Sequence, residues 1–398
     1  MPHPTRLLGA LVLSALVVVG GAACSDASAA QTRATGAPAH VARTPAHAST
    51  PAPSVAAPDP VFAEARQRLA SMSLDQRIAS MLMIHVAGTD AGQIAQNVAS
   101  TGAGGIILMG DNTDSGDGGV AAITSALNAG STLPALVAID EEGGEVSRLA
   151  SDPSPGAEVV RTQPPAVTTA AFQARAALLR SLGISVNFGI VADVTADPDS
   201  FLAGRVLGTD TPDSAAHVAA AVQGESGAVL STLKHFPGHG AAPGDSHHTI
   251  PVAAEGLDAW HTTDEPSFSA GIAAGAGLVM FGHLSYPAVD PAPASLSPAW
   301  HHILRDEMHF SGIAVTDDMA MLTDTGDARY TDAGANAVAA VAAGNDLLLY
   351  VPAVGPGGFD PSQIVAAVHT AVADGRIPVS TIDRAVLRLL RARLALAD

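Results

Sequence analysis

The sequence predicts a single catalytic domain with the (β/α)8 barrel fold over residues 60–398. Short apolar runs alternate along this region with Ala-rich amphipathic stretches, which is typical of parallel βα units. Eight such runs occur, and the region is long enough for a barrel, which takes about 250 residues or more. Polar residues that could carry chemistry follow several of the runs, where a parallel barrel would gather them on one face.

The eight apolar runs are the expected barrel strands. They cover residues 81–86, 105–109, 135–139, 186–190, 229–233, 278–281, 313–316 and 347–350. Helices are expected between them, including residues 170–182, 214–223, 298–308 and 335–343. Eight repeats within one domain favour a closed barrel over an open, doubly wound sheet.

The N-terminal region has the features of an export signal. Arg6 precedes an apolar run over residues 7–19 and the small residues 20–23, and about 13 apolar residues are too few to span a bilayer. We therefore expect a signal peptide over residues 1–23 and an exported protein. Residues 24–59 are almost wholly Ala, Pro, Ser, Thr and His, a composition that predicts a disordered tether.

Cys24 is the only cysteine in the chain, so it cannot form an internal disulfide. Its position after Gly21, Ala22 and Ala23 resembles a bacterial lipoprotein cleavage site, although that motif usually has Leu or Val where Gly21 stands. The resemblance implies a lipidated Cys24 that anchors the protein to the outer side of the cytoplasmic membrane. The alternative is an ordinary signal peptide that is cleaved nearby and releases the protein.

The charge of the chain narrows the range of partners. Asp and Glu total 38 against 19 Lys and Arg, which gives a net charge of −19 at pH 7. A charge of this sign repels nucleic acids and anionic lipid head groups. We expect no nucleic-acid partner, and contact with a membrane only through a lipid anchor.

Polar side chains stand at or just beyond the C-terminal ends of seven expected strands. Any one of them could simply cap the following helix. Together they predict a ligand-binding face, since the βα loops of a barrel open there. They are His85, Asp111, Asp140, Asp193, Lys234 with His235, His283 and Asp317.

The segment 234–247 is the most informative stretch of the chain. It reads K-H-F-P-G-H-G and then, after a short interval, D-S-H. Asp245 and His247 are two residues apart, so a turn can bring the carboxylate against the imidazole and make it a proton-transfer group. A solvated loop histidine is the alternative. A zinc site of His239, His247 and His248 is a further one, but no HExxH pattern or cysteine supports it, so we expect no metal and no other cofactor.

Two other segments offer groups for sugar chemistry. Asp317 follows a strand, and a carboxylate there could attack an anomeric carbon, although a helix-capping role is the alternative. Asp140 and Arg148 flank a Gly-Gly pair and supply an acceptor and a forked donor suited to sugar hydroxyls and an acetamido carbonyl. The alternative for these two is a surface ion pair of little value.

These segments carry a resemblance to a known family. The patterns are D-x-E-G-G-x-V-x-R at residues 140–148, K-H-F-P-G-H-G with D-S-H at 234–247, P-A-S-L-S at 293–297 and T-D-D-M at 316–319. In this order they resemble the family 3 glycoside hydrolases, and more narrowly their bacterial exo-β-N-acetylglucosaminidase branch in its single-domain, secreted lipoprotein form. The resemblance extends over about residues 62–397.

The resemblance implies roles for individual residues. Asp317 would be the nucleophile, and His247 paired with Asp245 the acid/base. The sugar would be held by a further set, to which His283 is added for its place at a strand end. These substrate-binding residues are Asp140, Arg148, Arg205, Lys234, His235 and His283.

Two segments depart from the family's usual pattern. Val206 and Leu207 stand where the family usually has Ser-Phe, and residues 187–193 lack the usual Ala-Pro. Both departures concern neighbouring contacts and leave the expected catalytic groups in place.

The expected function is retaining hydrolysis of terminal N-acetylglucosamine from peptidoglycan fragments or muropeptides. Within the larger family the alternative is a β-glucosidase or xylosidase. Such enzymes commonly carry a carboxylic acid/base on a second α/β domain, for which a sequence ending at Asp398 has no room. Phosphorolysis remains open because a histidine acid/base would also suit phosphate. A non-catalytic, glycan-binding surface lipoprotein would have lost the groups that Asp317, Asp245 and His247 retain.

Overall fold

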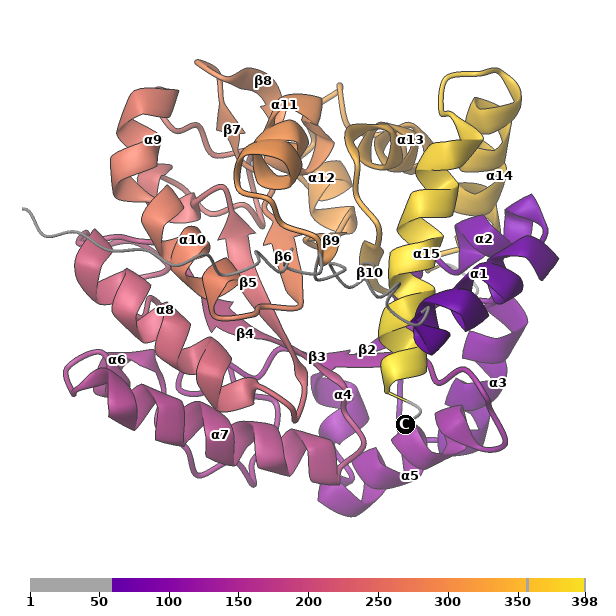
Figure 1. Ribbon diagram of the computed structural model, residues 1–398, viewed down its shortest axis with the longest axis horizontal. Helices are drawn as coiled ribbons and strands as arrows, with labels where there is room; N and C mark the ends of the chain where they lie inside the picture. The colour runs from indigo at the N-terminus through magenta and orange to yellow at the C-terminus, as the bar shows by residue number, and fades with distance from the viewer. Residues whose placement is uncertain (1–58, 356–357, 397–398) are drawn as a thin grey trace, which may run out of the picture. The chain divides into compact units, whose positions relative to one another are not determined.

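The computed structural model describes residues 59–355 and 358–396. The expected signal peptide, Cys24 and most of the tether lie outside these residues. The described residues belong to one compact unit, in which helices surround a central set of parallel strands (Figure 1). No helix among them is long and apolar enough to cross a lipid bilayer.

Eight parallel strands form the barrel, as the apolar runs predict. Their order is β10-β1-β2-β3-β4-β5-β6-β9, and a bridge between Val315 and Leu347 joins the two ends of the sheet. The (β/α)8 prediction is therefore confirmed. The strands are β1 (Leu82–His85), β2 (Gly105–Leu108), β3 (Leu136–Ile139), β4 (Val186–Val191), β5 (Leu230–Phe236), β6 (Leu278–Phe281), β9 (Ile313–Thr316) and β10 (Leu348–Ala353).

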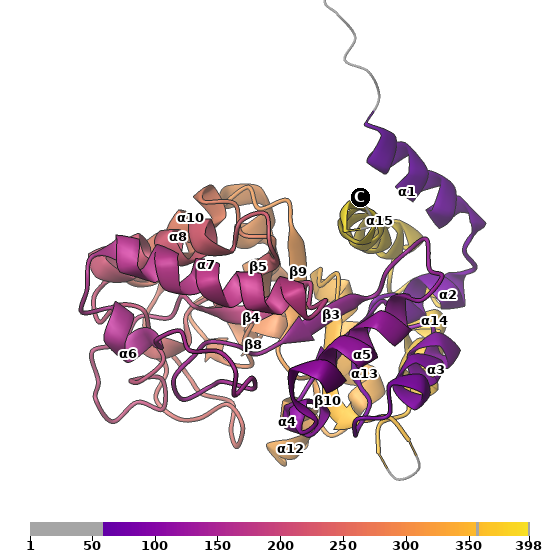
Figure 2. The same cartoon turned by 90° about the horizontal axis from the view of Figure 1, so that it is seen from below.

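The strand side chains are buried on both faces along almost the whole barrel. One face fills the barrel interior and the other packs under the helices, so the strands read as continuous apolar runs. Figure 2 shows α7 and α8, which pack against each other, along one flank.

The helices lie between the strands and at both ends of the domain. They are α1 (Pro60–Ser71), α2 (Leu74–Ala79), α3 (Ala91–Thr101), α4 (Gly110–Thr113), α5 (Gly116–Asn128), α6 (Ala157–Val160), α7 (Pro165–Ser181), α8 (Thr211–Glu225), α9 (Leu257–Thr263), α10 (Glu265–Ala273), α11 (Pro298–His302), α12 (Ala320–Asp324), α13 (Ala333–Ala343), α14 (Pro361–Ala373) and α15 (Val379–Ala395).

Three of the four named helical stretches lie essentially within α7, α8 and α13. The fourth, residues 298–308, differs from the prediction because α11 ends at His302 and continues as a π-helical turn, η3 (Ile303–Glu307). The Met308 amide donates to the Ile303 carbonyl at 2.9 Å, which closes that wider turn.

Aspartate side chains begin several helices by accepting hydrogen bonds from the first backbone amides, as N-cap residues do. Asp90, Asp210, Asp332 and Asp360 act in this way for α3, α8, α13 and α14. An unpredicted hairpin, β7 (Ser285–Tyr286) and β8 (Asp290–Pro293), follows β6. Two short 3₁₀ turns, η1 (His239–Ala241) and η2 (Ala294–Leu296), lie next to the strand ends that carry the predicted site.

Candidate active site

The C-terminal ends of the barrel strands bring most of the predicted site residues to one face. Asp140 follows β3, Lys234 and His235 lie near the end of β5, and Asp317 follows β9. Because the strands are parallel, all of these positions open on the same end of the barrel.

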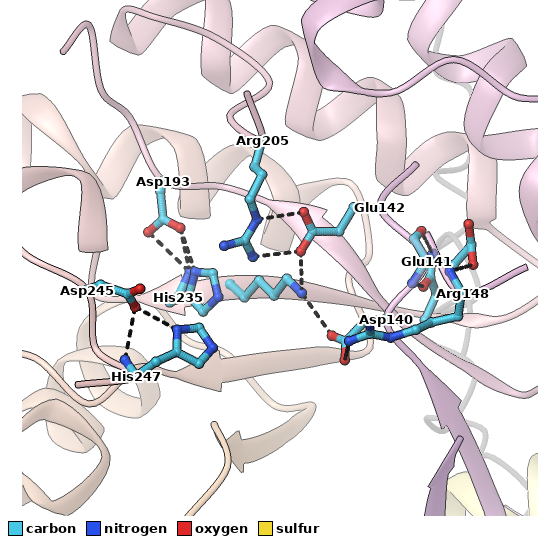
Figure 3. Close-up of polar contacts among 11 residues, drawn as sticks. Asp140, Glu141, Glu142, Arg148, Asp193, Arg205, His235, Asp245 and His247 are labelled. Carbon is cyan, nitrogen blue, oxygen red and sulfur yellow. Dashed lines mark hydrogen bonds and ion pairs between the residues drawn. The ribbon is translucent and has the colours of Figure 1, made fainter. Parts of the chain in front are cut away.

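Lys234 lies at the centre of a charged network, whose other members Asp140, Glu142 and Arg205 are labelled in Figure 3. Its Nζ atom is 3.0 Å from Oδ1 of Asp140 and 2.6 Å from Oε1 of Glu142. Glu142 also accepts two hydrogen bonds from Arg205, from Nε at 2.9 Å and from Nη2 at 2.8 Å. The structure thus brings Asp140, Lys234 and Arg205 together, and it does so through Glu142, a residue of the 140–148 motif for which no role was predicted.

The charge state of Glu142 follows from these contacts. Burial alone would raise its pKa, but the positive charges of Lys234 and Arg205 outweigh burial and lower the pKa to about 2. Glu142 is therefore ionised at neutral pH, and its carboxylate compensates two buried cations.

Arg148 faces the carboxylate of Asp140, with its Nη2 3.9 Å from Oδ2 of that residue. The turn that carries both is fixed from beneath by Glu141. This side chain accepts hydrogen bonds from the Ser147 hydroxyl at 2.5 Å, from the Arg148 amide at 2.8 Å and from the Leu149 amide at 3.0 Å. The ion pair that was the alternative for Asp140 and Arg148 is thus present at this distance, and both side chains remain partly exposed.

Asp193 holds His235 in place. Its Oδ2 lies 2.7 Å from Nδ1 of His235, and its carboxylate also accepts from the backbone amides of His235 and His239. Because a carboxylate only accepts, Nδ1 of His235 carries the hydrogen, and Nε2 is the nitrogen left to meet a ligand. Burial would raise the pKa of Asp193, but His235 and His239 hold it below its ordinary value.

Asp317 is the predicted nucleophile. Its backbone amide donates to the Phe281 carbonyl at 2.9 Å, and its Oδ1 accepts from the Asp318 amide at 2.8 Å. Burial raises its pKa, but His235, the Asp318 amide and Lys234 together bring the pKa below the ordinary value. The carboxylate is therefore ionised at neutral pH, which is the state that a nucleophile needs.

His283 lies behind Asp317 and is fully buried. One ring nitrogen, Nδ1, is 2.7 Å from the Ser295 hydroxyl, and the other, Nε2, is 2.9 Å from the Asp318 carbonyl. Neither nitrogen is free to contact a sugar, in contrast to the substrate-binding role that its strand-end position predicted.

Asp245 and His247 form the predicted pair on the loop between η1 and α9 (Figure 3). His247 Nδ1 lies 2.6 Å from Asp245 Oδ1, and the His247 amide donates to the same oxygen at 3.0 Å. The His247 side chain is 59% exposed. Among the described residues, no hydrogen bond or ion pair links this pair to Asp317 or Lys234.

The histidines of the alternative zinc reading lie in different surroundings. His239 is buried, whereas His247 and His248 are exposed. In residues 59–355 and 358–396, no three His, Cys, Asp or Glu side chains converge as metal ligands.

The loop that leaves β5 is fixed at its base. The Trp260 indole donates to the Pro237 carbonyl at 2.7 Å, and the Tyr286 hydroxyl donates to the Gly238 carbonyl at 2.6 Å. Gly238 has φ of 135°, and a Cβ added there would lie 2.3 Å from Oδ1 of Asp264. Only glycine fits this position, so the backbone conformation of the turn after Lys234 and His235 depends on Gly238.

Comparisons with known proteins agree with this geometry. The family model described as the glycosyl hydrolase family 3 N terminal domain matches residues 73–392. A β-hexosaminidase of Stenotrophomonas maltophilia is 35% identical over 253 residues, which are 61% of this chain and 75% of that protein. The β-hexosaminidase LpqI of Mycobacterium tuberculosis is 33% identical over 354 residues, which are 85% of this chain and 88% of that protein.

A solved structure shows the same fold. The family 3 β-N-acetylglucosaminidase of Paenibacillus sp. FPU-7 superposes with a TM-score of 0.74 at 30% identity, covering 82% of this chain and 64% of that one. The family match, the named relatives and the strand-end site agree with one another. The chain therefore belongs to glycosyl hydrolase family 3 and is a glycoside hydrolase of the β-hexosaminidase kind.

Proposed function

We propose that this protein is an exo-acting, retaining β-N-acetylglucosaminidase that releases terminal N-acetylglucosamine from peptidoglycan fragments or muropeptides. The observation that carries the proposal is the ionised, half-buried carboxylate of Asp317 beside Lys234 and His235, with the Asp245–His247 pair on a loop of the same barrel face. A nucleophile, sugar-binding groups and a proton donor are the parts that two-step glycoside hydrolysis requires.

In the proposed first step, Oδ2 of Asp317 attacks the anomeric carbon while His247 protonates the leaving oxygen. The bond from carbon to that oxygen breaks, and a glycosyl-enzyme ester forms. In the second step, His247 takes a proton from water, and the water oxygen displaces Asp317 with overall retention. Because His247 is exposed and, among the described residues, has no hydrogen bond or ion pair to Asp317 or Lys234, this mechanism requires its loop to close over the sugar.

The remaining predicted residues would hold the terminal sugar. Asp140 offers a partly exposed acceptor, Arg148 a forked donor, and His235 its Nε2. Arg205 already gives Nε and Nη2 to Glu142, so it would reach a hydroxyl through its remaining nitrogen. The Lys234 ammonium has three N–H donors. Two of them meet the carboxylates of Asp140 and Glu142, and the third would donate to the sugar.

The peptidoglycan assignment rests on export. A signal peptide over residues 1–23 and a lipid on Cys24 would place the enzyme outside the cytoplasm, where wall glycan and its fragments are found. Residues 24–59 would connect the anchor to the barrel. The carbohydrate is the partner in this proposal, and neither nucleic acid nor a cofactor takes part.

The direct test is release of the chromophore from 4-nitrophenyl N-acetylglucosaminide and its glucose and xylose analogues. We expect the N-acetylglucosaminide to be the preferred substrate. Added phosphate should leave the product as free sugar, which separates hydrolysis from phosphorolysis. Proton NMR should show the β-anomer first. No release between about pH 5 and 8, where a histidine acid/base works, would favour the non-catalytic binding protein, and the α-anomer first would exclude the covalent mechanism.

The role of Asp317 has its own test. Asp317→Asn keeps the size of the side chain and removes its charge, so turnover should fall below detection. The exposed Asp324→Asn is the control and should keep the wild-type turnover. An activated 5-fluoro N-acetylglucosaminyl substrate should add the mass of one sugar to the wild type, on the peptide that contains Asp317. Labelling of another peptide would assign the nucleophile elsewhere.

A further inference from the structure

The P-A-S-L-S motif at residues 293–297 has no part in the reaction described so far. Its third residue, Ser295, is fully buried, and its hydroxyl lies 2.7 Å from Nδ1 of His283. The motif therefore reaches the histidine that lies behind Asp317.

The hydrogen bonds around His283 define which nitrogen carries the proton. Nε2 is 2.9 Å from the Asp318 carbonyl, and a carbonyl oxygen only accepts, so Nε2 must donate. In the neutral ring, Nδ1 is then the acceptor, and the Ser295 hydroxyl donates to it. Burial lowers the pKa of His283 and favours this neutral ring.

Ser295 is itself held at both of its backbone groups. Its amide donates to the Gly282 carbonyl at 3.2 Å, just beyond the end of β6. Its carbonyl accepts from the Asn345 side chain at 2.8 Å, in the segment before β10. The hydroxyl that faces His283 is thus attached to the barrel at two points.

Asp318 links His283 to Asp317. Its carbonyl accepts from His283, and its Oδ1 accepts from the amides of Val351 and Ala320 at 3.0 and 3.1 Å. With side chain and carbonyl both held, its own amide points to Oδ1 of Asp317 at 2.8 Å. Within the described residues, Oδ2 of Asp317 accepts no hydrogen bond.

We propose that Ser295 and His283 are positioning residues, which act through Asp318 to hold the Asp317 carboxylate with Oδ1 occupied and Oδ2 directed at the anomeric carbon. The inference rests on the proposed role of Asp317 as the nucleophile. It assigns one residue of the P-A-S-L-S motif, Ser295, to the orientation of the nucleophile, since a misplacement of about 1 Å can cost about a hundredfold in rate.

Four variants test the relay. Ser295→Ala removes the donor to Nδ1, and Ser295→Thr retains a hydroxyl. His283→Leu removes both hydrogen bonds, whereas His283→Gln retains an amide that can donate to the Asp318 carbonyl. The matched control is Ser297→Ala, because Ser297 is equally buried but its hydroxyl binds Asp290 at 2.7 Å and caps α11.

The kinetic expectation is a loss in kcat alone. Ser295→Ala and His283→Leu should lower kcat on the 4-nitrophenyl N-acetylglucosaminide by about 10- to 100-fold, while KM and the Kd for N-acetylglucosamine stay within about twofold. The acid limb of kcat/KM should move to higher pH, because a displaced Asp318 amide stabilises the Asp317 carboxylate less. Ser295→Thr and His283→Gln should recover part of the loss, and Ser297→Ala should match the wild type.

A spectroscopic measurement tests the relay without relying on activity. Nitrogen-15 NMR of the wild-type histidines should show one ring, absent from His283→Gln, in the neutral Nε2–H tautomer at about pH 7. Ser295→Ala should broaden or shift that ring's signals. A charged ring or the Nδ1–H tautomer would overturn the relay, whatever the activity.

The two failures can be told apart. If the wild type and Ser297→Ala release no sugar from any glycoside, the proposed function is wrong. If both are active and Ser295→Ala keeps the wild-type kcat and acid limb, the relay is wrong. Equal losses of kcat and melting temperature in Ser295→Ala and Ser297→Ala would also overturn it, because the effect would then be structural.

Discussion

The shortest contact of Lys234 is to Glu142, with Nζ 2.6 Å from Oε1, rather than to the more exposed Asp140 at 3.0 Å. Glu142 also takes two nitrogens of Arg205. The two cations that the sequence assigned to the sugar are therefore first bound to a carboxylate of the protein. This arrangement fixes their positions before any ligand arrives and limits the donors that a sugar can use.

Removal of the Glu142 charge should destabilise the fold. Glu142→Gln leaves two buried cations with less compensation, and we expect the free energy of unfolding at pH 7 to fall by about 3 kcal/mol. Urea denaturation measures it, with the exposed Glu158→Gln as the control. A loss equal to that of the control would show that Lys234 and Arg205 find sufficient compensation in Asp140.

The same carboxylate should give a pH dependence of defined sign. Its folded pKa of about 2 lies below the ordinary value of 4.5, so its contribution is present above pH 4.5 and is lost as pH falls towards 2. The wild type should lose stability faster than Glu142→Gln over that window. Parallel curves for the two proteins in acid would contradict the assigned charge state.

His247→Ala should separate substrates by their leaving groups. General acid catalysis contributes about 10²- to 10⁴-fold, so the variant should lose that much on a disaccharide and far less on a dinitrophenyl glycoside, whose leaving group needs no proton. His248→Ala, at the exposed neighbouring position, is the control. Equal losses on both substrates would remove His247 from the acid role.

The turn after His235 should not tolerate a side chain at Gly238. Gly238→Ala combines a positive φ with a Cβ 2.3 Å from Asp264, and we expect a loss of about 2 kcal/mol or more in unfolding free energy. At Gly244, φ is 108° but the nearest atom to an added Cβ is 3.6 Å away, so Gly244→Ala should cost about 1 kcal/mol. Similar losses for the two would indicate that the loop base moves freely around Asp264.

The buried carboxyl group of Asp264 should make the free energy of unfolding fall as pH rises through neutrality. Burial and the neighbouring Glu255 raise its pKa well above the ordinary value. The folded state therefore binds more protons than the unfolded state at neutral pH, and stability decreases as pH rises. Asp264→Asn should flatten this slope between pH 5 and 8, and the exposed Asp258→Asn should leave it unchanged. Denaturation series at several pH values measure both slopes.

The strands and the polar residues at their ends could be predicted because both depend on local pattern. Apolar runs identify strands that are buried on both faces, and parallel pairing places Asp140, Lys234 and Asp317 at one end. The hairpin β7–β8 was not predicted, because Asp290–Pro293 has two prolines and little apolar character. The π-helical turn after α11 escaped because apolar periodicity does not distinguish it from an α-helix.

The contacts within the site were harder to predict, because they join distant segments. Glu142 meets Arg205 across 63 positions of sequence, and no local pattern reports that distance. Asp193 was placed at a strand end but received no role, since its partners are mainly backbone amides. The engagement of His283 depends on where the Asp318 carbonyl points, which a sequence does not display.

The exposure of His247 has a consequence for the timing of a reaction cycle. In the proposed mechanism one imidazole visits the sugar twice, first carrying a proton and then without it. Held 59% exposed on an outer loop, it is open to the attacking water, which returns in the second step the proton given up in the first, so the cycle needs no internal proton wire. The departing glycan can also diffuse away while the loop is open. The rate at which the loop opens and closes would therefore set an upper limit on kcat.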